Sequence, residues 1–111
     1  MNHLLKTLRG IKCHVTIMLI ASVRLELFIP AVHSLKEKRS VLKSIITRLR
    51  NEFNASIAEV DEHDRWQRGV IGVACVGSET RYLEGQIDAI IRWIEQNRPD
   101  VSIVDIEREL L

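Results

Sequence analysis

The chain has 111 residues, a formal net charge of +1, 46% hydrophobic residues and 28% charged residues. This length and composition are typical of one soluble globular domain that is large enough to form a single core without disulfides or metals. The near balance of charge means that only a local patch, and not the global field, can favour nucleic acid. Two cysteines, Cys13 and Cys75, stand in no metal-binding or redox spacing, which indicates a reduced, cytoplasmic compartment.

Residues 1–17 differ from the rest because they carry three basic residues and no acid, whereas residues 18–111 hold 13 Lys and Arg against 15 Asp and Glu. A membrane-surface arm, an RNA-binding arm or a secretory signal are conceivable readings. However, the apolar stretch 15–23 continues without a break into a strand that the domain needs. We therefore expect residues 1–17 to form an N-terminal extension, weakly ordered or outside the core, and residues 18–111 to form one domain.

From Leu19 to Ile29 apolar residues alternate with mixed ones, which predicts a half-buried strand that Pro30 ends. The next stretch, Ser34 to Phe53, begins with a Ser-x-x-Glu capping box and has apolar residues at three- and four-residue spacing, which predicts an amphipathic helix. A basic stripe follows its opposite side and contains Lys36, Arg39, Lys43 and Arg50. Lys38 breaks this pattern, because it projects toward the apolar side.

Residues 54–60 predict a second strand, and residues 66–77 predict a third that is apolar on both faces and therefore central in the sheet. A second helix follows, with Ser78 as its expected cap and an apolar stripe that starts at Leu83. A last strand over residues 101–107 completes the chain.

The element order is therefore βαββαβ, which predicts an α+β fold: a ferredoxin-like sandwich with a four-stranded antiparallel sheet and both helices on one face. In this topology the loop after the first strand and the hairpin after the second lie at the same end of the sheet. The start of the first helix should thus lie beside the hairpin that carries Asp61, His63, Trp66 and Gln67.

The blocks Ser-Leu-Lys-Glu-Lys-Arg at 34–39 and Ala-Glu-Val-Asp…Trp-Gln-Arg at 58–68 resemble the YlxP-like family of small bacterial proteins, a domain of unknown function. The resemblance covers roughly residues 18 to 107, and it implies a ferredoxin-like fold without an established activity. Such proteins typically begin near Met18, so residues 1–17 depart from the pattern. Members are often encoded beside translation-initiation and ribosome-maturation factors, which associates them with RNA or the ribosome.

Catalytic and metal chemistry find little support in the sequence. Residues 61–64 include three acids and His63, but they are consecutive in a hairpin, where neighbouring side chains diverge, so a solvated turn is expected and no metal. A histidine–carboxylate enzyme is conceivable, yet no nucleophile elbow, phosphate loop or paired acids accompany it. We therefore expect that the protein is not an enzyme and that it binds no cofactor.

Lys38 and Trp66 each have two interpretations. Lys38 needs an anion, with Asp61 as the first choice and Glu59 as the second, and the pair is either a structural tie or part of a ligand site. Trp66 can stack on a base or cap the core, and burial is the commoner fate of a single tryptophan.

The sequence therefore favours a non-enzymatic RNA- or ribosome-associated protein that uses the basic first helix and the adjacent hairpin. The candidate binding residues are Lys36, Lys38, Arg39, Lys43, Arg50, Asp61, His63, Trp66 and Gln67. The alternative is a protein-interaction or small-ligand-sensing module that forms a homodimer through the sheet face or an edge strand. No membrane partner is expected.

Overall fold

The structure is a computed structural model that describes residues 18–61 and 65–111, without the side chain of Asp61. The extension predicted for residues 1–17 and the candidate residue His63 lie outside the described residues. The elements are β1 (Leu19–Phe28), α2 (Leu35–Glu52), β2 (Ser56–Asp61), β3 (Arg68–Gly77), α3 (Thr80–Asn97) and β4 (Ser102–Leu110). This order confirms the predicted βαββαβ sequence of elements.

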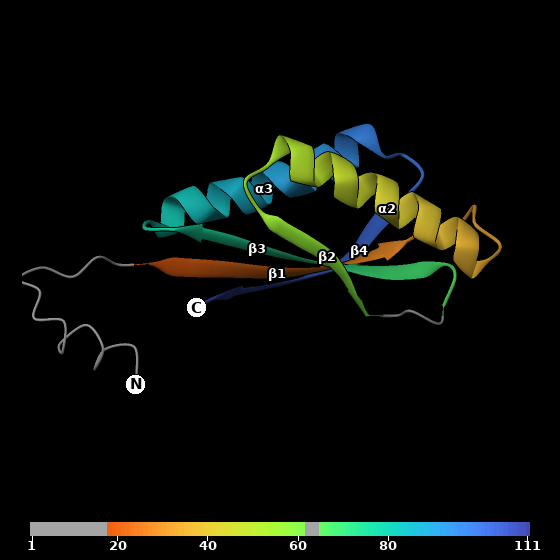
Figure 1. Ribbon diagram of the computed structural model, residues 1–111, viewed down its shortest axis with the longest axis horizontal. Helices are drawn as coiled ribbons and strands as arrows, with labels where there is room; N and C mark the ends of the chain where they lie inside the picture. The colour runs from red at the N-terminus through yellow and green to blue at the C-terminus, as the bar shows by residue number, and fades with distance from the viewer. Residues whose placement is uncertain (1–17, 62–64) are drawn as a thin grey trace, which may run out of the picture.

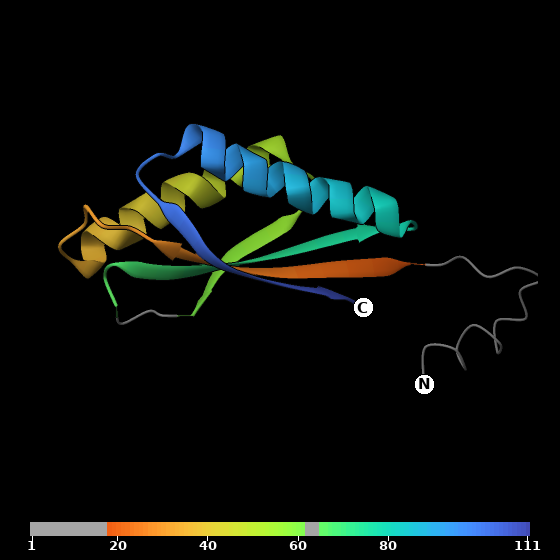
Figure 2. The same ribbon diagram turned by 180° about the vertical axis from the view of Figure 1, so that it is seen from behind.

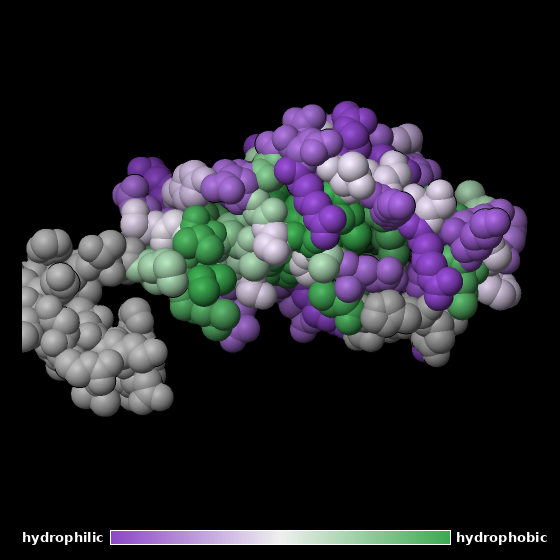
Figure 3. Space-filling view, viewed as in Figure 1, coloured by the Kyte–Doolittle hydropathy of each residue, from purple (hydrophilic) through white to green (hydrophobic). Residues whose placement is uncertain are grey.

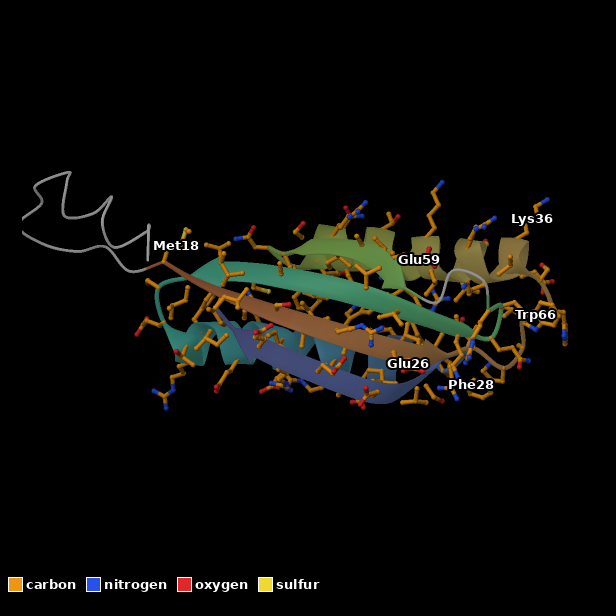
Figure 4. All side chains as sticks on the ribbon, turned by 90° about the horizontal axis from the view of Figure 1, so that it is seen from below. Met18, Glu26, Phe28, Lys36, Glu59 and Trp66 are labelled. Carbon is orange, nitrogen blue, oxygen red and sulfur yellow. The ribbon has the colours of Figure 1, made fainter. Side chains whose placement is uncertain are left out.

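The four strands form one sheet in the order β2-β3-β1-β4, and each neighbouring pair is antiparallel. Both helices cover the same face (Figures 1 and 2). The predicted ferredoxin-like α+β sandwich is therefore confirmed, with β3 and β1 in the centre and β2 and β4 at the edges. The opposite face of the sheet, which we call the open face, has no helix over it (Figure 4).

The core lies between the helices and the helix-facing side of the sheet. Alternate residues of β1 from Ala21 to Leu27 point into it and are almost completely buried, because a strand places successive side chains on opposite faces. The apolar stripes of the two helices cover them. The central members of this core are Val23, Leu25, Leu27, Ile45, Leu49, Ile71, Leu83, Ile90 and Ile94.

The capping box predicted at the start of α2 is present in a slightly shifted form. Ser34 Oγ accepts a hydrogen bond from the backbone N–H of Glu37 at 3.1 Å. The Glu37 carboxylate accepts from the backbone N–H of His33, one residue before the cap. Two amides near the helix start are thereby satisfied, which explains why the helix begins at Leu35.

Some boundaries differ from the prediction. The expected cap Ser78 is wrong: α3 has Glu79 in the cap position without a side-chain cap, because the N–H of Leu83 bonds to the carbonyl of Glu79. β4 extends to Leu110 instead of ending at residue 107, because it pairs with β1 as far as Ala21. β2 and β3 each begin two residues later than expected.

Candidate functional site

The loop after β1 and the start of β3 meet at one end of the sheet. The backbone N–H of Ile29 donates to the carbonyl of Gln67 at 2.9 Å, and the side-chain amide of Gln67 donates to the carbonyl of Pro30 at 3.2 Å. Figure 4 shows Lys36 and Trp66 at this same end. The predicted juxtaposition of the first helix with the hairpin is therefore confirmed, and Gln67 is one of the residues that join them.

Trp66 is 49% exposed, so the expectation that it is buried is wrong. It lies in the turn that precedes β3, at the end of the sheet, instead of in the helix-covered core. An open pocket of about 450 Å³ adjoins it, which we call the aromatic pocket. The residues that line the aromatic pocket are Phe28, Arg65, Trp66, Gln67 and Arg68.

Arg68 is held against the aromatic pocket by two contacts. Its Nη1 lies 2.8 Å from Oε2 of Glu26, and its Cζ lies 5.5 Å from the centroid of the Phe28 ring. Phe28, Glu26 and Trp66 are labelled in Figure 4. A pocket of two aromatic rings and two guanidinium groups can stack on a planar group and meet an anion. Phe28 and Arg68 could not be predicted as site residues from the sequence, because only the β1–β3 register places them opposite each other.

The outer surface of α2 carries the basic stripe that the sequence predicts. Lys36, Arg39 and Lys43 are all exposed. Arg50 differs, because its Nε and Nη2 both donate to the carbonyl of Ile57, at 3.1 and 2.6 Å. This residue therefore ties the last turn of α2 to the edge strand β2, in addition to carrying charge at the surface.

A shallow groove of about 360 Å³ lies between α2 and β2. Its basic residues are Arg39, Lys43 and Arg50, and its acid is Glu59. Leu42 and Ile46 are among the apolar side chains that also line it. The groove thus presents three cations of the basic stripe side by side above apolar surface.

Lys38 is completely buried, as its position on the apolar side of α2 predicts. Its Nζ donates to the carbonyl of Arg68 at 3.2 Å and lies 3.9 Å from Oε2 of Glu59. Glu59, the second choice from the sequence, is therefore a carboxylate partner of Lys38, and the first choice stays a prediction because the side chain of Asp61 lies outside the described residues. Because the ammonium is engaged inside the protein, the geometry favours a structural tie that joins the start of α2 to β2 and β3.

The open face of the sheet has a different charge from α2. Arg24 pairs with Glu107 at 3.2 Å, and Arg68 pairs with Glu26. The register places Asp105 and Glu109 on this same face, opposite Glu26 and Ser22. Acids therefore outnumber bases on the part of the open face that β1 and β4 form.

The surface of the helices differs from the open face. Figure 3 shows the polar residues that cover the helices on the side of β2, with apolar residues between them.

The described part of the chain offers no site for a metal ion and no membrane-spanning helix. Residues 18–61 and 65–111 contain no group of three or more His, Cys, Asp or Glu that could hold a metal ion. Neither helix is long and apolar enough to cross a membrane. Cys75 is buried, and this burial raises the pKa of its thiol, which keeps the sulfur protonated and unreactive at neutral pH.

Fold and site together define a small ferredoxin-like α+β domain with a basic helix and an open aromatic pocket at one end of its sheet. The profile of the family described as "Protein of unknown function (DUF503)" matches residues 20–108. The chain belongs to this family.

One relative and two solved structures show how far the similarity extends. The chain is 42% identical over 77 residues to "Uncharacterized protein YlxP" of Bacillus subtilis (strain 168), an alignment that covers 69% of this chain and 77% of that protein. The de novo designed protein Foldit4 aligns with a TM-score of 0.49 and 14% identity over 86% of this chain and 97% of that one. A C-terminal segment of the alpha subunit of aIF2 from Pyrococcus abyssi aligns with a TM-score of 0.39 and 16% identity, over 98% of this chain and 57% of that one. Both structural likenesses are too distant to support a functional argument.

Proposed function

We propose that this protein is a non-enzymatic RNA-associated module that binds single-stranded RNA, including RNA exposed on the ribosome. The observation that carries this proposal is the half-exposed Trp66 in the aromatic pocket, at the same end of the sheet as the start of the basic α2. A tryptophan ring that is open to solvent on a cationic surface is suited to stacking on a base.

The charge distribution favours a particular path for the RNA backbone. Lys36, Arg39 and Lys43 line the outer surface of α2, where phosphates find cations. The open face carries the acids of β4, which repel phosphates. We therefore expect the strand to follow α2 and to reach the aromatic pocket with one base, instead of lying across the sheet.

The chemistry of the pocket supports binding more than bond breaking. Its side chains supply flat rings, guanidinium groups and one amide, which recognise bases and phosphates. Gln67, the one amide, is already bonded to Pro30. None of the described lining residues is a histidine or a carboxylate that could act as a general base.

The test is a salt titration of binding to bulk ribosomal RNA. Four phosphate contacts on single-stranded RNA, one for each cation of the basic stripe (Lys36, Arg39, Lys43 and Arg50), predict a log–log salt slope near −3, at roughly 0.7 per contact. The variant Lys36→Gln/Lys43→Gln removes two exposed cations of α2 without disturbing the bond between Arg50 and Ile57, and it should reduce the slope by about 1.4. The matched control is Arg81→Gln/Arg92→Gln, which removes two exposed cations from α3.

The proposal predicts that the control keeps the slope of the natural protein while the α2 variant loses part of it. Absence of binding at low salt would contradict RNA association altogether. An unchanged slope in the α2 variant would remove the basic stripe from the function. Either result would leave the protein-interaction module, the second candidate, which the geometry of β4 supports.

A further inference from the structure

β4 is an edge strand of nine residues, Ser102–Leu110, and among the described residues it pairs only with β1. Figure 2 shows it along the near side of the sheet, below α3. Seven of its residues, 104–110, are all exposed. A long, exposed edge presents a row of backbone N–H and C=O groups that can pair with another strand. The charged side chains of β4 limit indiscriminate pairing at this edge, so a strand that pairs here must match their charge.

The helix-facing side of this edge is apolar apart from Arg108, which lies opposite Val23 and pairs with Asp88 of α3 at 2.7 Å. Ile106 and Leu110 lie opposite Leu25 and Ala21 of β1, on the side of the sheet that faces the helices, and they are 40% and 49% exposed. A groove of about 240 Å³ lies between the last residues of β4 and the first half of α3. Its apolar lining consists of Ala21, Leu83, Ile87 and Leu110. An added strand would therefore find apolar surface for alternate side chains.

The open side of the same edge is acidic. Asp105, Glu107 and Glu109 share the open face and alternate along the strand with Ile106, Arg108 and Leu110, which face the helices. Glu107 pairs with Arg24, whereas the structure records no ion pair for Asp105 or Glu109 among the described residues. Cross-strand neighbours on one face interact directly, so these acids determine which strand can pair here.

A second copy of this chain is a poor occupant. Antiparallel pairing of two β4 strands about a twofold axis brings open-face residues opposite open-face residues. Any register whose axis passes through one of the residues 105–109 sets at least one of the acids at 105, 107 and 109 against another or against its own copy, for example Asp105 against Glu109 when the axis passes through Glu107. Like charges directly opposite destabilise a strand pair. The charge pattern therefore disfavours a homodimer through this edge.

We propose that the β4 edge is a docking site for an extended segment of a basic partner protein, which adds a fifth strand to the sheet. Such a segment alternates apolar residues, which face Ile106, Leu110 and the groove beside α3, with Lys or Arg residues, which face Asp105 and Glu109. Main-chain hydrogen bonds supply affinity, and the alternating side chains supply specificity. This site is on the opposite edge of the sheet from β2 and does not depend on RNA binding.

The test uses two synthetic ten-residue peptides, one alternating valine with lysine and one alternating valine with glutamate. Binding is measured by fluorescence anisotropy, and amide hydrogen exchange locates the site. The lysine peptide should bind the full chain and protect backbone amides of β4, while the glutamate peptide should not. A lysine peptide that is N-methylated along one edge should lose binding, because its main chain can no longer donate to β4.

A charge reversal makes the test specific. The variant Asp105→Lys/Glu109→Lys should reverse the preference, with about tenfold weaker binding of the lysine peptide, because two cross-strand pairs become repulsive. The matched control Glu52→Lys/Glu95→Lys changes two exposed acids of the helices and should keep the original preference.

Four results would overturn the proposal: equal affinity for both peptides, an unchanged preference in the reversed variant, protection of β2 instead of β4, or no binding. Concentration-dependent protection of β4 without peptide would assign the edge to a second copy. Protection that disappears when residues 1–17 are removed would assign it to that segment of the chain. Both assignments contradict a basic partner.

Discussion

Lys38 of α2 and Glu59 of β2 form an ion pair inside the protein, with Nζ 3.9 Å from Oε2. The lysine side chain has no exposed surface, and Glu59 Oε2 is buried without a hydrogen-bond partner. The same ammonium donates to the carbonyl of Arg68. One cation therefore links the start of α2 to both strands of the hairpin, at the end of the sheet that also carries Trp66.

Replacing Lys38 with Ala should lower the free energy of unfolding by about 1–3 kcal/mol, because Glu59 loses its counter-charge in a mostly buried position. Urea denaturation measures the loss. Lys36→Ala is the matched control, since Lys36 is exposed on the same turn and should change stability by less than about 0.5 kcal/mol. The double variant Lys38→Met/Glu59→Gln should recover part of the stability, because it removes both charges and keeps their volume. Equal stability of Lys38→Ala and the control would contradict the tie.

Gly85 occupies an exposed position inside α3, and a Cβ placed there would meet no atom within 4 Å. Gly85→Ala should therefore raise the free energy of unfolding by about 0.4–1 kcal/mol, because alanine loses less backbone entropy in a helix. Thermal unfolding of the two proteins checks this. The contrasting variant is Gly69→Ala, whose Cβ would lie 2.8 Å from Cδ1 of the buried Leu42 and which should be destabilising. A destabilised Gly85→Ala would show that α3 depends on flexibility at this turn.

Arg98 and Asp100 form a bidentate pair after α3, with contacts of 3.0 and 2.7 Å, and Arg98 also donates to Ser44 of α2 at 2.9 Å. The hydrogen bonds from Arg98 lower the pKa of Asp100. Because the folded pKa lies below the unfolded value, the pair stabilises the fold above about pH 4 and loses this contribution as the pH falls through the folded pKa.

Asp100→Asn should accordingly be less stable than the natural chain at pH 7, by less than about 1 kcal/mol because this carboxylate is 39% exposed. The difference should shrink as the pH is lowered below about 4. Urea denaturation of both proteins at pH 7, 5 and 3 measures it. A difference that stays constant across this range would show that the carboxylate charge is not responsible.

Trp66→Ala should weaken RNA binding by about 1–3 kcal/mol without changing the salt slope, because stacking involves no phosphate. Trp93→Ala is unsuitable as a control, since that ring packs on the core beside Arg48. Tyr82→Ala is the better control, because it removes an exposed aromatic ring from the far end of the sheet. Equal losses in both variants, or a change in slope for Trp66→Ala, would remove base stacking from the proposed function.

Much of the fold is encoded in short segments and could be predicted. The alternation in residues 19–29 and the three- and four-residue spacing in residues 34–53 each identify an element, because burial repeats with the period of the local backbone. The capping box marks the helix start and could be recognised because its two residues, Ser34 and Glu37, are only three positions apart. Lys38 was recognisable as a buried cation from its position on the apolar side of the same helix.

Which residues far apart in the chain contact each other was decided only by the tertiary structure. Lys38 meets Glu59 on the helix-facing side of the sheet, opposite Ile71, and a shift in register between Glu59 and Asp61 interrupts the alternation of β2 at this point. Simple alternation from the sequence cannot locate such a bulge, because it adds a residue to one strand only. The sequence therefore ranked Asp61 before Glu59, and only the structure places Glu59 beside Lys38.

The contacts at the surface of the candidate site also depend on strand register and packing, which the sequence does not reveal. Phe28 meets Arg68 through the β1–β3 register, Arg50 reaches the carbonyl of Ile57 across the α2–β2 boundary, and Trp66 is exposed because it lies in a turn at the end of the sheet. Residue type and local period determine whether a side chain belongs to a helix or a strand and which side it faces. Which distant group it then contacts follows from strand register and from the place of each loop, and these are properties of the packed chain.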